Sequence, residues 1–107
     1  MANYNIDGLL FEGPYDDTNQ VRNLSGVYFI CSYMGGDIMN LKNFNVLDVG
    51  ESGRLRDRLT NHPRSECWKK YSNGGTVVAF IHLANEPSRM DVENTLRGKY
   101  NLPCGKR

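Results

Sequence analysis

A carboxylate near the end of the chain lies where it could do chemistry. Met90, Leu96 and Tyr100 mark the apolar face of a predicted helix. Glu93 is three residues from both Met90 and Leu96, so its side chain lies on that face or at its margin. A buried carboxylate costs several kcal/mol unless it is paired or binds a metal. Two interpretations stay open: Glu93 binds a cation, or it forms a salt bridge to Arg97 and turns to solvent.

A second group of side chains suited to chemistry lies in the first two thirds of the chain. Arg54, Arg58 and His62 are four residues apart and form one ridge of a predicted helix. An arginine held against a sheet suits a phosphate, because its guanidinium offers two parallel hydrogen bonds. A solvated helix face is the more common place for arginine. Tyr28 lies in a predicted strand, where a tyrosine usually packs in the core or against a neighbouring strand.

Positive charge gathers in two segments, although the net charge is only +1. Residues 54–70 carry six Lys and Arg against two acids, and residues 89–107 carry five against two. If the segments met in space they would form a basic face for phosphates, and the alternative is two ordinary solvated helix faces. The candidates for nucleic-acid contact in the central segment are Arg54, Arg56, Arg64, Lys69 and Lys70.

Three strands and two main helices must position these side chains. Runs rich in β-formers predict strands over residues 27–33, 44–49 and 76–83. The loop between the first two strands is too short for a parallel crossover helix, so we expect them to be antiparallel. Helices are predicted after caps at Ser52 and Ser88, with a short helical turn at 66–71 between them.

The first 24 residues read as an irregular lead-in, in which Gly13-Pro14 turns the chain. The remaining order of strand, strand, helix, strand and helix predicts an α+β domain. We therefore expect a small three-stranded, mainly antiparallel sheet flanked by helices.

Length and composition exclude several classes of protein. A chain of 107 residues fits one compact domain. No apolar run approaches the roughly 18 residues of a transmembrane helix, and no secretory signal begins the chain, so we expect a cytoplasmic protein. Three widely spaced cysteines argue against a disulfide framework. His62 and Cys67 are the only close pair of zinc-ligand types, so zinc is not expected.

Two short motifs and three single residues, in this order and spacing, resemble the GIY-YIG nuclease superfamily. The resemblance covers about residues 25–104 of a single domain spanning 1–107. The ordered set is more specific than either three-letter motif alone. It consists of Gly26-Val27-Tyr28, Asp48-Val49-Gly50, Arg58, His62 and Glu93.

The resemblance implies a metal-dependent DNA endonuclease that hydrolyses phosphodiester bonds, built on the small antiparallel sheet expected above. By the family's pattern, Glu93 holds one divalent cation, Mg²⁺ or Mn²⁺. Arg58 contacts the scissile phosphate, and Tyr28 orients or deprotonates the attacking water. His62 assists with proton transfer or phosphate contact. DNA is the implied partner, and no contact with a membrane is expected.

The second motif departs from the family, because Asp48 stands where a tyrosine near the catalytic water is expected. Asp48 could be a substitute general base or a second carboxylate facing the metal. It could mark a catalytically impaired module that binds nucleic acid without cleaving it. It could also point away from the site, with Tyr28 alone sufficient. A domain with no nucleic-acid role, serving interaction or regulation, is a further alternative.

The sequence contains no separate DNA-reading element such as a zinc finger or a long basic arm. Any specificity is therefore expected to come from a partner protein, from a homodimer, or from the loops at 34–43 and 63–75.

Overall fold

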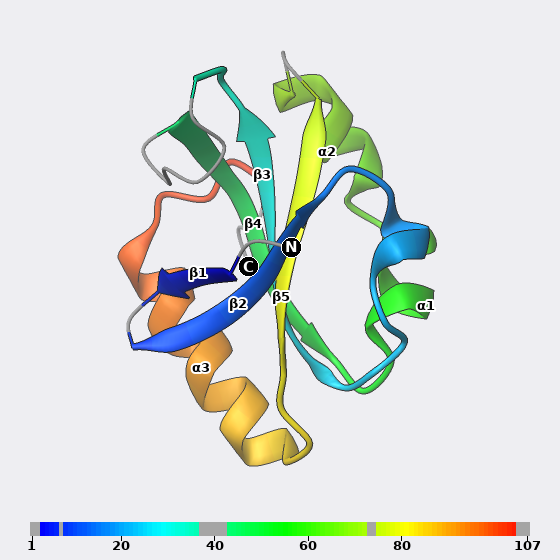
Figure 1. Ribbon diagram of the computed structural model, residues 1–107, viewed down its shortest axis with the longest axis vertical. Helices are drawn as coiled ribbons and strands as arrows, with labels where there is room; N and C mark the ends of the chain where they lie inside the picture. Colours follow the sequence, from blue (N-terminus) through cyan, green and yellow to red (C-terminus); the bar gives the residue numbers. More distant parts are fainter. Residues whose placement is uncertain (1–2, 7, 37–42, 73–74, 105–107) are drawn as a thin grey trace.

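Five antiparallel strands form one sheet in the order β1-β2-β5-β3-β4 (Figure 1). The computed structural model describes residues 3–6, 8–36, 43–72 and 75–104. The strands are β1 (Asn3–Ile6), β2 (Leu9–Tyr15), β3 (Gly26–Tyr33), β4 (Phe44–Ser52) and β5 (Thr76–His82). The helices are the 3-10 turn η1 (Thr18–Gln20), α1 (Leu55–Thr60), α2 (Ser65–Tyr71) and α3 (Glu86–Lys99).

The expectation of a three-stranded sheet is wrong, although the α+β class is right. The segment expected to be an irregular lead-in supplies β1 and β2, which extend the sheet beyond β5. Gly13-Pro14 lies inside β2 rather than in a turn, at the irregularity of register between Glu12 and Tyr15. A bulge of this kind tolerates proline. Gly13 is needed because an added Cβ would lie 2.7 Å from the carbonyl oxygen of Val78.

The other elements lie close to their predicted ranges. Strands β3 and β4 are antiparallel, and β5 lies in the middle of the sheet. Helix α3 begins two residues before its predicted cap, because Asn85 is the N-cap and accepts the N–H of Ser88 at 3.1 Å. Ser52 was expected to cap α1 but is the last residue of β4, and the N-cap of α1 is Arg54, whose side chain makes no capping hydrogen bond.

Strand β3 is buried on both faces, and its alternating side chains supply two cores. Val27, Phe29 and Cys31 pack in a core that includes Leu96 of α3. Tyr28 and Ile30 pack in the other core, with α1 and α2. Helix α3 lies across the sheet from α1 and α2 (Figure 1). Among the helices of the described ranges, none combines the length and apolarity needed to cross a lipid bilayer.

A disulfide joins Cys67 of α2 to Cys104, which follows α3. The odd number and wide spacing of the cysteines had argued against a disulfide framework, and they did not indicate this bond. The two Cα atoms are 5.7 Å apart, and the two residues are separated by 37 positions in the sequence. The backbone N–H of Cys104 donates to the carbonyl of Leu47 in β4 at 3.0 Å. The disulfide and this hydrogen bond together tie α2 to β4, the strand that carries Asp48. Cys31 is a buried free thiol.

Removing the disulfide should destabilise the protein. We expect the double variant Cys67→Ala/Cys104→Ala to lose about 3–4 kcal/mol of unfolding free energy, because the crosslink restricts a long loop of the unfolded chain. Urea unfolding of the two proteins under oxidising conditions measures the difference. A reductant should lower the wild-type midpoint and leave that of the double variant unchanged. Equal free energies for the oxidised wild type and the variant would contradict the expectation.

Candidate active site

The centre of the site is a buried hydrogen bond between Tyr28 and His62. The tyrosine Oη and the imidazole Nε2 are 2.6 Å apart, and both side chains are buried. His62 Nδ1 accepts the backbone N–H of Arg64 at 3.0 Å, so in the neutral imidazole the proton is on Nε2. His62 therefore donates to Tyr28, and the tyrosine keeps its own O–H proton for another acceptor.

Gly50 of the second motif makes room for the tyrosine of the first. Tyr28 and Gly50 are partners in the β3–β4 register. A Cβ added at Gly50 would lie 2.2 Å from Tyr28 Oη and 2.4 Å from its Cζ, closer than any side chain tolerates. Gly26 is constrained in the same way, because its Cβ would lie 2.0 Å from the carbonyl oxygen of Ile81. Both motif glycines are thus required by close packing.

Burial and four charged side chains set the pKa of Tyr28. Burial is the largest influence and raises its pKa to about 12. The negative charges of Asp48 and Glu93 also raise this pKa, whereas the positive charges of Arg64 and Arg58 lower it. The tyrosine is therefore a neutral hydroxyl at pH 7. The charges of Arg58 of α1 and Glu93 of α3 thus both act on one tyrosine of β3.

His62 is held in its neutral form. Burial, together with the positive charges of Arg64 and Arg58, lowers its pKa to about 4, against the opposing effect of Asp48. An imidazole in this state keeps one donor and one acceptor through the physiological pH range. That state matches the two hydrogen bonds that His62 makes.

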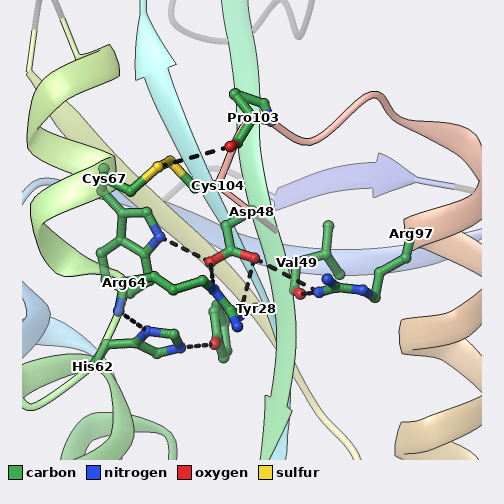
Figure 2. Close-up of polar contacts among 10 residues, drawn as sticks. Tyr28, Asp48, Val49, His62, Arg64, Cys67, Arg97, Pro103 and Cys104 are labelled. Carbon is green, nitrogen blue, oxygen red and sulfur yellow. Dashed lines mark hydrogen bonds and ion pairs between the residues drawn. A yellow bond between two sulfur atoms is a disulfide. The ribbon is translucent and has the colours of Figure 1, made fainter. Parts of the chain in front are cut away.

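Asp48 is fully buried and engaged by three partners (Figure 2). Arg64 donates to both carboxylate oxygens, from Nε at 2.7 Å and from Nη2 at 3.2 Å. Trp68 Nε1 donates to Oδ2 at 2.9 Å. Arg97 approaches from α3, with its Nη1 3.7 Å from Oδ1, and also donates to the carbonyl of Val49. A carboxylate surrounded in this way is poorly placed to accept a proton from water.

The side chain of Arg58 is exposed and makes no hydrogen bond or ion pair with the rest of the described chain. The other arginines of residues 8–36, 43–72 and 75–104 all have partners. Those partners are Glu12 for Arg22, Asp57 for Arg54, the carbonyl of Val21 for Arg56, Asp48 for Arg64, Glu51 for Arg89, and the carbonyl of Val49 for Arg97. Arg58 therefore has its whole guanidinium available for a phosphate.

The five residues considered for nucleic-acid contact divide into two sets. Arg56 and Arg64 are directed inward, to Val21 and Asp48. The remaining three are exposed and have a surface contact within their own helical segments: Arg54 pairs with Asp57, Lys69 with Glu66, and Lys70 lies over the ring of Tyr71.

The two basic segments do meet in space, but at Asp48 rather than on an open face. Arg64 reaches this carboxylate from the central segment and Arg97 from the terminal one. Lys106 and Arg107 lie outside the described residues, as do 37–42 and 73–74 of the two loops considered for specificity.

Glu93 is half-buried on α3. Met90 was expected on the buried face of this helix, but it is 49% exposed, and Arg89 and Leu96 are the buried positions. Glu93 is four residues from Arg89 and three from Leu96, so it still lies towards the buried side. Its charge acts on both Tyr28 and Arg64.

No cluster of three or more His, Cys, Asp or Glu suited to a metal occurs in the part of the chain that the structure describes. Mg²⁺ does not need such a cluster, because it usually keeps several waters and binds through one or two carboxylates together with substrate phosphates. Glu93 fits this mode. The carboxylates of Asp48 and Glu51 are each paired with an arginine.

The role of Trp68 as a partner of Asp48 was not predicted from the sequence. The available signal was its indole N–H, which needs an acceptor when the ring is buried. Arg64 was interpreted as a surface residue, because its position in the sequence does not indicate that its guanidinium reaches Asp48 of β4.

No protein-family model, curated protein or solved structure matches this chain. The resemblance to the GIY-YIG superfamily therefore depends on the motifs themselves.

Enlarging Gly50 should disrupt the site. We expect Gly50→Ala to lower the free energy of unfolding by about 1–3 kcal/mol, because the new methyl group overlaps the tyrosine ring and must displace it. Gly53→Ala is the matched control, since a Cβ there meets nothing within 4 Å and should change stability by less than about 0.5 kcal/mol. Chemical denaturation measures both. Equal effects of the two substitutions would contradict the close packing of Tyr28 on Gly50.

The stability of the protein should fall in mild acid. Folding lowers the pKa of His62 from 6.5 to about 4, so the unfolded chain binds more protons between these values. The contribution of His62 is therefore fully present above about pH 6.5 and is lost as the pH falls towards 4. His62→Gln is the control, because its amide can make both hydrogen bonds without titrating. Urea unfolding between these two pH values should show that the free energy of unfolding falls more steeply for the wild type than for His62→Gln. The same pH dependence in both proteins would contradict the prediction.

Proposed function

We propose that this protein is a divalent-metal-dependent endonuclease that hydrolyses phosphodiester bonds in DNA. The observation that carries the proposal is the environment of one buried tyrosine. Tyr28 is hydrogen-bonded to His62, and the charges of Arg58 and Glu93 act on that same tyrosine. These are the residues through which the sequence resembles the GIY-YIG nucleases.

The chemistry requires a positioned water, neutralised charge on the phosphate and stabilisation of the leaving oxygen. The free guanidinium of Arg58 would bind the scissile phosphate through two parallel hydrogen bonds. Glu93 would hold one Mg²⁺ or Mn²⁺, which supplies Lewis-acid stabilisation of the phosphate and acidifies bound water.

Tyr28 would orient the attacking water as a neutral hydroxyl. Its pKa of about 12 makes the phenolate rare at pH 7, so proton abstraction by the tyrosine alone is disfavoured. The donor from His62 fixes its oxygen and leaves the O–H proton directed elsewhere. Asp48 has no part in this scheme as a base, because its oxygens are occupied by Arg64 and Trp68.

One observation favours a second candidate, a module of the same fold that binds nucleic acid without cutting it. The second motif offers no tyrosine, and Asp48 is committed to internal partners. Such a module would contact phosphates through the exposed side chains of Arg54, Arg58, Lys69 and Lys70. Its binding would weaken steeply with salt.

Cleavage of supercoiled plasmid in Mg²⁺ or Mn²⁺ tests the nuclease. We expect Arg58→Ala and Glu93→Gln each to lower the rate by about 10²–10³-fold, the usual loss when one electrostatic contact to the transition state is removed. Asp91→Asn is the matched control for Glu93→Gln, because Asp91 is an exposed acid on the same helix. Arg58→Ala should leave the free energy of unfolding within about 0.5 kcal/mol of wild type, since the side chain is exposed and has no partner.

The outcomes separate the two candidates. Equal cleavage by the wild type and both site variants would exclude this site. Salt-sensitive DNA binding by a wild type that does not cut would support the binding module instead.

A further inference from the structure

Asp48, which replaces the expected tyrosine of the second motif, is connected to the Tyr28–His62 hydrogen bond through the short segment that carries Arg64. Asp48 receives both arms of the Arg64 guanidinium and the indole N–H of Trp68. Arg64 is only two residues beyond His62. Its backbone N–H donates to His62 Nδ1, while its side chain is anchored on Asp48 (Figure 2).

The second partner of Asp48 also holds the histidine. The ring centroids of His62 and Trp68 are 4.5 Å apart, with an interplanar angle of 42°. Apart from its bond to Tyr28, the contacts of the imidazole described above therefore come from Arg64 and Trp68. Both of those residues are fixed by the carboxylate of Asp48.

This arrangement selects one form of the imidazole. With the N–H of Arg64 on Nδ1, the neutral ring carries its proton on Nε2 and donates to Tyr28. If the segment carrying Arg64 shifted, Nδ1 could carry the proton instead, and Nε2 would become an acceptor that competes for the tyrosine O–H. The direction of the Tyr28–His62 bond thus depends on a contact made by a neighbour.

We propose that Asp48 is a positioning residue that, through Arg64 and Trp68, locks His62 in the tautomer that donates to Tyr28. Through that bond His62 would hold Tyr28, the residue proposed to orient the attacking water, in a fixed position. The inference rests on the proposed function for its catalytic consequence. The tautomer lock itself does not depend on cleavage.

Two-bond ¹H–¹⁵N NMR of the histidine ring tests the lock at pH 7. We expect a single tautomer protonated on Nε2 for His62 in the wild type, and a mixture of tautomers in Asp48→Asn. The asparagine keeps the volume of the side chain and removes the charge that holds Arg64. Trp68→Phe, which keeps a packed ring and removes the indole N–H, serves as a second variant if Asp48→Asn does not fold. If His62 kept the wild-type tautomer in the folded variants, the proposal would be overturned, whether or not the protein cleaves DNA.

A double-mutant cycle tests the catalytic consequence. Asp48→Asn should lower the cleavage rate by about 10–100-fold, as is usual when an outer partner that orients a functional residue is lost. Glutamine cannot change tautomer, so the same substitution should cost much less in a His62→Gln background. Additive losses would show that Asp48 acts only on general stability and would overturn this part of the proposal. Failure of the wild type to cut while the NMR result holds would count against the nuclease and not against the lock.

Discussion

The ion pair between Asp48 and Arg64 is the interaction on which the site depends. Taking a carboxylate fully out of water is expensive, and the cost is offset only when partners saturate its oxygens. Three segments supply those partners: the residue before α2, α2 itself, and α3. The need to satisfy one buried charge therefore fixes two helices, α2 and α3, against β4. Loss of a single partner would leave the others around an uncompensated charge.

The same constraint explains the electrostatic character of the molecule. Most arginines of the described ranges are used to pair with acids or to donate to backbone carbonyls. Arg64 and Arg97, one from each basic segment, are therefore turned towards a buried carboxylate and not towards an open face. Arg58 differs because α1 presents it to solvent while Leu55 and Leu59 of the same helix pack inward. The guanidinium of Arg58 therefore remains available to a ligand, whereas the other described arginines already have partners within the protein.

The sequence predicted the elements whose signals are local. Strands β3, β4 and β5 are runs of β-formers bounded by glycines or turn residues, and α3 begins directly after its polar cap, Asn85. Strand β2 was missed because Gly13-Pro14 is a turn signal by composition. Only the approach of β5, with the carbonyl of Val78 against Gly13, makes an extended conformation necessary there. The disulfide was missed for a related reason, since nothing local to Cys67 or Cys104 indicates that α2 meets the segment after α3. Within the site, the residue types of Tyr28 and His62 were visible, but the partners of Asp48 depend on tertiary contacts that spacing does not encode.

The three cysteines have a consequence for how the protein could be followed in solution. Two are linked to each other, and the third is enclosed in the sheet core, where burial raises the pKa of its thiol to about 12. Alkylating reagents attack thiolates that they can reach, so the oxidised, folded chain presents them with no target. Modification of Cys31 would then proceed only when β3 and its neighbours open. The rate at which Cys31 is alkylated would therefore report how often strand β3 becomes transiently exposed.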